Sequence, residues 1–124
     1  MNYFEMINQI IEYIEIHLKE ELNLKELAQK ASLSPYHFHR IFTTTTGYSP
    51  MEYIRKRRIY FAFQEIRNSK KSILEIALEL GYSSNETFTR AFFKECGSKP
   101  SEIRNYQRKQ FTEKISHTQS NLQR

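Results

Sequence analysis

The stretch IALELGYSSNETFTRAFFKECGSKP, residues 76–100, decides the fold, because LAQKASLSPYHFHRIFTTTTGYSP at residues 27–50 follows the same pattern. The earlier matching positions lie 49 residues apart and the later ones 50, so the second stretch has one added residue in its turn. Each stretch reads as a short helix, a turn and a second helix. The matches are Leu27-Ala28 with Ile76-Ala77, Ala31 with Leu80, Ser34 with Ser84, Phe38 with Phe88, Phe42 with Phe92, Gly47 with Gly97, and Pro50 with Pro100.

Two copies of one small unit in a basic chain predict a protein that reads a repeating surface. Duplex DNA is the commonest such surface, and its major groove recurs every ~34 Å along one face. The net charge is +5, but residues 1–22 contain five Glu and one Lys, so this segment carries −4 and the remainder +9. We therefore expect a basic body that binds double-stranded DNA, with an acidic first helix held away from the polyanion.

Composition excludes several other classes of protein. The chain has 124 residues, which fits one domain or two small lobes, and its single Cys96 permits no internal disulfide. We expect Cys96 to be a small buried apolar residue. No apolar run approaches the ~20 residues of a membrane span, and the N-terminus lacks a signal-peptide pattern. These features favour a cytoplasmic, nucleoid-associated protein with no membrane contact.

Nothing in the sequence predicts catalysis, a cofactor or a metal site. His37 and His39 lie two residues apart, so on a helix they point in different directions and no second ligand pair follows. The chain also lacks a glycine-rich phosphate loop and a nucleophile with a nearby base. We therefore predict that it is not an enzyme.

Start and stop signals predict an all-α fold of seven helices, with no strand of any length. Capping residues occur at Asn23, Ser34, Ser49 and Ser72, with either Ser83 or Ser84 starting the sixth helix, while glycines end three of the helices. The predicted helices cover residues 3–21, 23–30, 35–45, 50–67, 72–80, 84–96 and 100–109, and the tail from residue 112 to 124 is expected to be frayed.

The helices group into two helix-turn-helix lobes and a long connecting helix. The predicted boundaries are an N-terminal lobe at residues 1–48, the connecting helix at 49–67, a C-terminal lobe at 68–110 and a polar, disordered tail at 111–124. At 1.5 Å per residue the connecting helix would span on the order of 27 Å, enough to hold two lobes one groove repeat apart.

A helical wheel separates an inward from an outward face on the second helix of each lobe. Phe38, Ile41 and Phe42 share the inward sector of the first, as Phe88, Ala91 and Phe92 do in the second. The outward sets are Tyr36, His39, Arg40 and Thr43, and Glu86, Thr89, Arg90 and Phe93.

The matched arginines are the main candidates for base recognition, because a guanidinium group can donate two hydrogen bonds to guanine O6 and N7. The alternative is that both faces are polar only because water covers them. Tyr36 and His39 would contact a thymine methyl group or a phosphate. Glu86 has two interpretations, as an acceptor from cytosine N4 or as the capping-box partner of Ser83 three residues earlier.

Phosphate contacts are expected where helices begin and where basic residues cluster. Residues 55–58 are the densest basic cluster, but consecutive helical residues radiate around the axis, so only one or two of them can face a phosphate or an acidic side chain. The others would be solvated. The residues assigned to phosphate positioning are Ser34, Thr43, Ser49, Arg55, Ser84 and Thr87.

These residues resemble the DNA-binding domain of the AraC/XylS family of bacterial transcription regulators over roughly residues 5–107. The most specific match is residues 73–104, including Leu80-Gly81-Tyr82-Ser83-Ser84 and Arg90-Ala91-Phe92. The resemblance implies a pair of homeodomain-like units that bind one asymmetric site as a monomer. The base-reading roles that it implies fall on Tyr36, His39, Arg40, Asn85, Glu86, Thr89 and Arg90.

The chain departs from the family pattern at Tyr36 and His39, where Trp and Gln are frequent, and at Phe93, where a polar or basic residue is expected. The preferred DNA sequence therefore cannot be transferred. The resemblance further implies an activator that works with RNA polymerase. It also allows a stand-alone regulator or the leading part of a longer chain with a sensor domain downstream.

Two functions from other classes are also compatible with the sequence. A helical protein-interaction module would bind its partner with little salt dependence, whereas neutralisation of phosphates gives a steep dependence. A nonspecific architectural DNA binder would keep the salt dependence and lose the preference among sequences.

Overall fold

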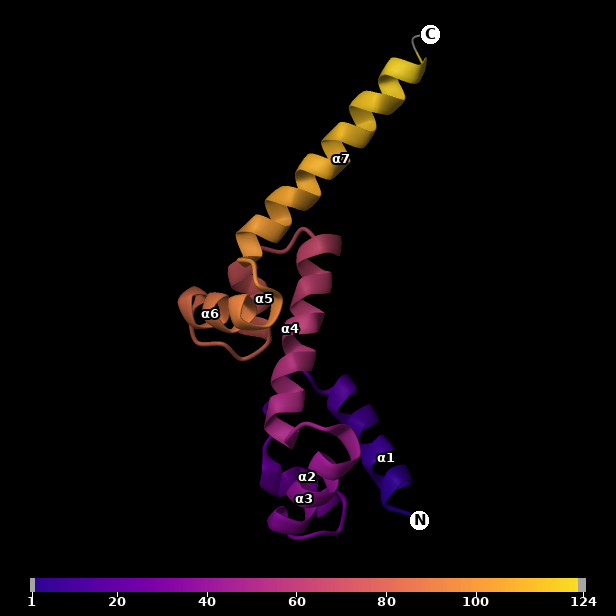
Figure 1. Cartoon of the computed structure of the whole chain (residues 1–124). Helices are drawn as coiled ribbons and strands as arrows, with labels where there is room; N and C mark the ends of the chain where they lie inside the picture. Colours follow the sequence, from indigo (N-terminus) through magenta and orange to yellow (C-terminus); the bar gives the residue numbers. More distant parts are fainter. Residues whose placement is uncertain (1, 123–124) are drawn as a thin grey trace. The chain divides into compact units, whose positions relative to one another are not determined.

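The computed structural model describes the backbone of residues 2–122, and side chains for residues 2–110 and 112 (Figure 1). Seven α-helices and no strands occur in this part of the chain, which confirms the predicted all-α class. The helices are α1 (Tyr3–Ile16), α2 (Leu24–Lys30), α3 (Pro35–Thr46), α4 (Pro50–Asn68), α5 (Ile73–Glu79), α6 (Asn85–Cys96) and α7 (Pro100–Leu122). None of the described helices is both long and apolar enough to cross a membrane.

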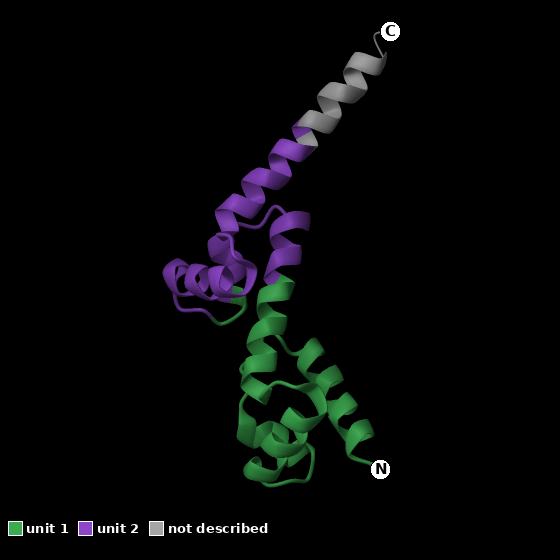
Figure 2. Ribbon diagram, in the orientation of Figure 1, with its two compact units in different colours: residues 1–61, 79–81 green, residues 62–78, 82–124 purple. Residues whose placement is uncertain are grey.

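The chain divides into two compact units, which Figure 2 colours separately. Unit 1 comprises residues 1–61 and 79–81, and unit 2 comprises residues 62–78 and 82–124. The long helix α4 contributes its first part to unit 1 and its last part to unit 2. The boundaries at residues 48 and 67 remain a prediction, and Ile54 in the first part of α4 is buried in the core of unit 1.

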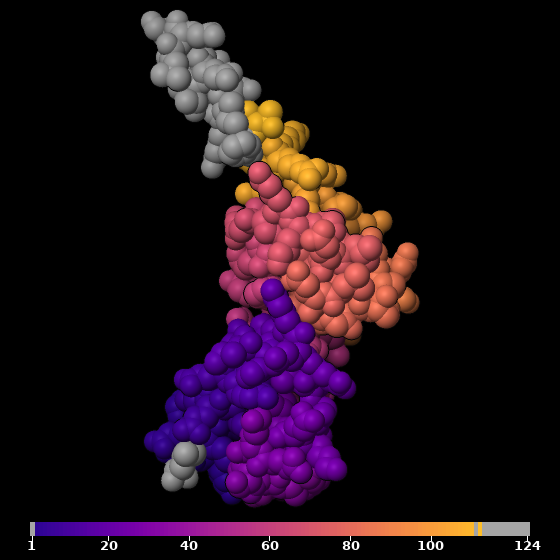
Figure 3. Space-filling view, turned by 180° about the vertical axis from the view of Figure 1, so that it is seen from behind, coloured from indigo at the N-terminus to yellow at the C-terminus, as the bar shows by residue number. Residues whose placement is uncertain are grey.

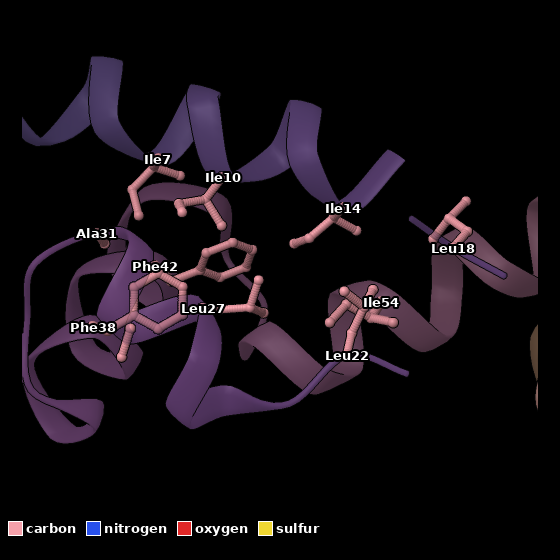
Figure 4. Close-up of a cluster of buried hydrophobic side chains, with 11 residues drawn as sticks. Ile7, Ile10, Ile14, Leu18, Leu22, Leu27, Ala31, Phe38, Phe42 and Ile54 are labelled. Carbon is pink, nitrogen blue, oxygen red and sulfur yellow. The ribbon is translucent and has the colours of Figure 1, made fainter. Parts of the chain in front are cut away.

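Unit 1 is built on the apolar face of α1. Ile7, Ile10 and Ile14 point from this helix toward Phe38 and Phe42 of α3, and all five side chains are buried (Figure 4). Figure 3 shows the indigo side chains of α1 lying directly against the purple helix-turn-helix of the same unit. The helical spacing of the isoleucines therefore acts through tertiary packing, which is the main source of stability for a short helix.

Helix α1 ends at Ile16, so its predicted extension to residue 21 is wrong. The N–H group of His17 donates to the carbonyl oxygens of Tyr13 and Ile14, and a turn follows. Leu18 and Leu22 are buried from this turn and the link after it. Leu18 and Leu22 continue the helical spacing of the apolar residues, but the backbone that carries them into the core is not helical.

Helix α7 continues to Leu122, so the predicted helix end near residue 109 is wrong. The sequence after Pro100 contains no further proline or glycine to stop the helix. Polarity alone was therefore a poor guide to where this helix ends. The last two residues of the predicted tail, 123 and 124, lie outside the described residues.

Unit 2 repeats the packing of unit 1 with other helices. Phe88 and Phe92 of α6 are buried, and the Phe92 ring stacks on Phe63 of α4 with 6.4 Å between centroids. Ile76 and Ala77 of α5 are also buried. The last part of α4 thus takes the place in unit 2 that α1 takes in unit 1.

The turns of the two helix-turn-helix motifs share one backbone geometry. Leu33 donates to the carbonyl oxygen of Ala28 at 3.0 Å, and Tyr82 donates to that of Ala77 at 3.1 Å. The residue just before each donor is left-handed, with φ of +57° at Ser32 and +87° at Gly81. Matching positions of the two motifs are 49 residues apart up to Leu33 and Tyr82, and 50 residues apart from Ser34 and Ser84 onward. Ser83 is therefore the residue added in the second turn.

Cys96 is exposed, so its predicted burial is wrong. It is the last residue of α6, and the chain leaves the helix at Gly97 directly after it. Partial desolvation, followed by the negative charge of Glu95, raises the pKa of the Cys96 thiol. The thiol is therefore a poorer nucleophile at neutral pH than an ordinary exposed cysteine.

Candidate DNA interface

The second helix of each motif begins and ends in the same way. Ser34 caps α3 by accepting a hydrogen bond from the His37 N–H at 3.1 Å, and Ser84 caps α6 by accepting one from the Thr87 N–H at 3.2 Å. Both helices contain 12 residues and end at a left-handed glycine, Gly47 or Gly97. Serine at the cap and glycine after the last turn satisfy backbone groups that a helix end leaves free.

The buried faces of α3 and α6 fix the rotation of each helix about its axis. The rings of Phe38 and Phe42 lie 5.7 Å apart at 52°, and those of Phe88 and Phe92 lie 5.7 Å apart at 50°. Since the same two positions are buried in the same geometry, residues 50 apart face outward at equivalent places. The structure thus brings the predicted outward residues together as two equivalent surfaces, one on each unit.

On α3 the outward residues form an exposed polar and aromatic surface. Tyr36 is 78% exposed, and His39 and Arg40 are also exposed. Arg40 makes no hydrogen bond or ion pair with any described residue. Thr43 is only half exposed, and its hydroxyl donates to the His39 carbonyl oxygen at 2.7 Å.

On α6 the corresponding surface carries Asn85, Glu86 and Arg90, all exposed, and Thr89, which is half-buried. The Thr89 hydroxyl donates to Asn85 Oδ1 at 3.4 Å. Within the described part of the chain, Arg90 has no hydrogen bond or ion pair, like Arg40 at the equivalent place. An unpaired guanidinium group at the same position of both helices is free to bind a ligand.

Glu86 does not cap its helix, so the capping-box interpretation is wrong. The structure starts α6 after Ser84, and the third helical position is therefore Thr87. Ser83 lies one residue too early, and its hydroxyl is 3.4 Å from that of Thr87. The Glu86 carboxylate is exposed and remains available as a hydrogen-bond acceptor.

The residues predicted to contact phosphates lie at helix starts and on α4. Ser34, Ser49 and Ser84 each accept a backbone N–H bond at the start of a helix. The Thr87 hydroxyl is already hydrogen-bonded within the chain, because it lies 2.6 Å from Ser84 Oγ and donates to the Ser84 carbonyl oxygen at 3.1 Å. Its hydroxyl has little capacity left for a further ligand.

The basic cluster on α4 separates into residues with internal partners and one without. Arg57 binds Glu15 through two nitrogen atoms, at 2.5 Å and 3.1 Å, and this hydrogen bonding raises the pKa of Arg57. The predicted contact with an acidic side chain is thus confirmed at Arg57. Arg55 is exposed, and no described residue forms a hydrogen bond or ion pair with it.

One arginine in each unit binds the backbone near the link that precedes the helix-turn-helix motif, a role that was not predicted from the sequence. Arg58 donates to the carbonyl oxygens of Leu18 and Glu20 at 2.9 Å and 2.7 Å. In unit 2, Arg104 donates to those of Ile66, Ser69 and Lys71. No sequence signal distinguishes these arginines from exposed ones, because their acceptors are backbone atoms far away along the chain.

The family model described as "Helix-turn-helix domain" matches residues 27–106. The regulatory protein SoxS of Salmonella typhimurium is 38% identical over 104 residues, which cover 84% of this chain and 97% of that protein. The chain belongs to the AraC-type helix-turn-helix family. SoxS of Escherichia coli strain K12 is 35% identical over the same share of both chains.

Solved structures of AraC-type DNA-binding domains have the same fold. The DNA-binding domain of AdpA, determined with a target DNA, is 26% identical, with a TM-score of 0.79 over 84% of this chain and 94% of that one. An AraC-type regulator from Chromobacterium violaceum is 24% identical, with a TM-score of 0.78, and shows the likeness of fold alone. As a member of the AraC-type family, this chain is a sequence-specific DNA-binding transcription regulator, and the family is not one of enzymes.

Proposed function

We propose that this AraC-type regulator binds one asymmetric duplex site as a monomer, with α3 and α6 in successive segments of the major groove. The observation that carries the proposal is the pair Arg40 and Arg90, which are exposed, lie at equivalent positions of two similarly capped helices and have no hydrogen bond or ion pair among the described residues. The surfaces around them differ, since Tyr36 and His39 on α3 correspond to Glu86 and Thr89 on α6. Two different reading surfaces on one chain require two different half-sites.

Each outward residue has a chemistry that suits the major groove. Arg40 and Arg90 would donate to guanine O6 and N7, and Asn85 would pair with adenine N6 and N7. Glu86 would accept from cytosine N4, since its carboxylate is exposed and does not cap the helix. The complete set proposed to read bases is Tyr36, His39, Arg40, Asn85, Glu86, Thr89 and Arg90.

Phosphate contacts would set the position of each helix without reading sequence. The starts of α3, α4 and α6 place serine hydroxyls and free backbone N–H groups together, an arrangement that favours anions. Arg55 adds an exposed positive charge on α4, while Thr43 and Thr87 would contribute less because their hydroxyls already donate within the chain. The proposed phosphate set is Ser34, Thr43, Ser49, Arg55, Ser84 and Thr87.

Selection of the purified chain against a random ~25 base-pair duplex library at physiological salt would test this proposal. We expect an asymmetric motif of two short blocks about one helical turn apart, bound by one chain per duplex. A symmetric motif bound by two chains would overturn the monomer proposal. Salt-sensitive binding without any enriched motif would contradict base reading by these residues.

We further propose that the regulator activates transcription by contacting RNA polymerase, and that it acts in the cytoplasm on nucleoid DNA. The support is its similarity to regulatory proteins of this family over most of their length. Transcription in vitro from a promoter with the selected site upstream would test the sign of regulation. More transcript on addition of the protein would support activation, and less would identify a repressor.

A further inference from the structure

Phe93 is a large apolar side chain on the outward face of α6. It is 52% exposed, and no aromatic contact involves it within the described residues. At 100° per residue it lies within about 40° of Glu86 and Thr89 and about 60° of Arg90, at the centre of the proposed reading surface. An apolar group held in water at this place is stabilised when a ligand covers it.

The surroundings of Phe93 favour a polyanion over an apolar protein surface. It is the one large hydrophobic residue of α6 among the exposed ones, so it does not belong to an apolar patch on this helix. Arg90 and Lys94 beside it are exposed cations. On the wheel the two cations lie on the same side of Phe93, and the exposed Glu86 also lies near the ring. An isolated ring beside two exposed cations fits the floor of a groove whose rims carry phosphates.

Thr43 is the residue of α3 equivalent to Phe93, and it also lacks a free hydrogen-bond donor. Thr43 stands 50 residues earlier, and its hydroxyl proton is used by the His39 carbonyl oxygen at 2.7 Å. Neither Thr43 nor Phe93 therefore offers the DNA a free hydrogen-bond donor. Both motifs place an apolar group next to the unpaired arginine.

We infer that Phe93 is a specificity-determining residue that contacts the 5-methyl group of a thymine beside the base pair read by Arg90. The inference rests on the proposed function and assigns one further base to the same surface. The thymine methyl is the apolar group that the bases present in the major groove, and Phe is one of the side chains that contact it. A phosphate offers a phenyl ring no comparable contact, because burial of the ring stabilises a complex in proportion to the apolar area covered.

The test removes the methyl group from the DNA and the ring from the protein. Each thymine in the α6 block of the selected site is replaced in turn by deoxyuridine, and dissociation constants are measured for the wild-type chain, Phe93→Ala and Phe93→Leu. Tyr106→Ala is the matched control, since Tyr106 is 63% exposed and lies on α7. Circular dichroism of each variant checks that the helices are retained.

For the wild type we expect one deoxyuridine to weaken binding about fourfold, the effect of one buried methyl group. The same replacement should not change DNA binding by Phe93→Ala. It should still weaken DNA binding by Phe93→Leu, and it should weaken binding by Tyr106→Ala as much as binding by the wild type. The inference would be overturned if deoxyuridine weakened binding equally in the wild type and Phe93→Ala at every thymine. It would also be overturned if the selected α6 block contained no thymine. In both cases the motif itself would still support the proposed function. Failure of the selection to yield a motif would overturn both.

Discussion

Arg40 and Arg90 are the residues on which sequence recognition depends most directly, because both guanidinium groups are exposed and unpaired within the described residues. We expect Arg40→Ala and Arg90→Ala each to weaken binding to the selected site by about 1–3 kcal/mol and to relax discrimination at one base pair. Competition titrations with sites altered one base pair at a time would measure both effects. An equal loss of affinity on all sequences would identify the two residues as phosphate contacts instead.

A second residue-scale prediction concerns the left-handed turn positions Ser32 and Gly81. A non-glycine residue in this region costs about 1–2 kcal/mol, while glycine loses about 0.5–1 kcal/mol more conformational entropy on folding. Ser32, with φ of +57°, should therefore be improved by Ser32→Gly, which we expect to raise the free energy of unfolding by about 0.5 kcal/mol.

Gly81→Ala is the opposite test, and we expect it to lower the free energy of unfolding by about 1 kcal/mol. No atom lies within 4 Å of a Cβ added there, so backbone strain alone would account for the loss. Urea unfolding of both variants would measure these changes. A stabilising Gly81→Ala would show that the two turns do not share the left-handed geometry.

At the scale of the element, α3 and α6 each combine a structural cap with a proposed phosphate contact at one serine. Replacing Ser34 or Ser84 by alanine should destabilise the chain by about 1 kcal/mol through loss of the cap. Ser34→Asp should keep the cap, because its carboxylate can accept the His37 N–H bond, yet weaken DNA binding by repelling a phosphate. Urea unfolding and DNA titration together separate the two roles, and unchanged DNA affinity in Ser34→Asp would remove Ser34 from the phosphate set.

Most helix starts and stops were predictable from the sequence because their signals are local. Ser34, Ser49 and Ser72 accept hydrogen bonds from backbone N–H groups three residues on, and Gly47 and Gly97 end α3 and α6. The failures occurred where no local signal decides the backbone. The end of α1 depends on how Leu18 reaches the core from a turn, and α7 runs on because nothing stops it.

At the scale of the whole molecule, the uneven charge predicts how DNA binding responds to salt. Each phosphate neutralised by a protein cation contributes about −0.9 to the slope of log K against log salt concentration. Arg55→Gln should make this slope shallower by about 0.9, because Arg55 is exposed and lacks an internal ion pair among the described residues.

Arg57→Gln is the matched control, two residues away on α4. Its guanidinium group is held by Glu15, so its removal also frees a carboxylate and should leave the count of phosphate contacts unchanged. Titrations at several salt concentrations would compare the slopes. Equal changes in slope for both variants would show that phosphate binding by α4 is not confined to Arg55.

The start and stop signals of the sequence by themselves determined the all-α fold, and the duplicated pattern of residues 27–50 and 76–100 determined the two helix-turn-helix motifs and the outward faces that carry Arg40 and Arg90. These features follow from local periodicity and capping, which act within a few residues. Only the tertiary structure decided which cations remain free. Arg55, Arg57 and Arg58 look alike in sequence, but Glu15 and the carbonyl oxygens of residues 18 and 20 engage two of them. Their partners lie some forty residues away along the chain, where only packing brings them together.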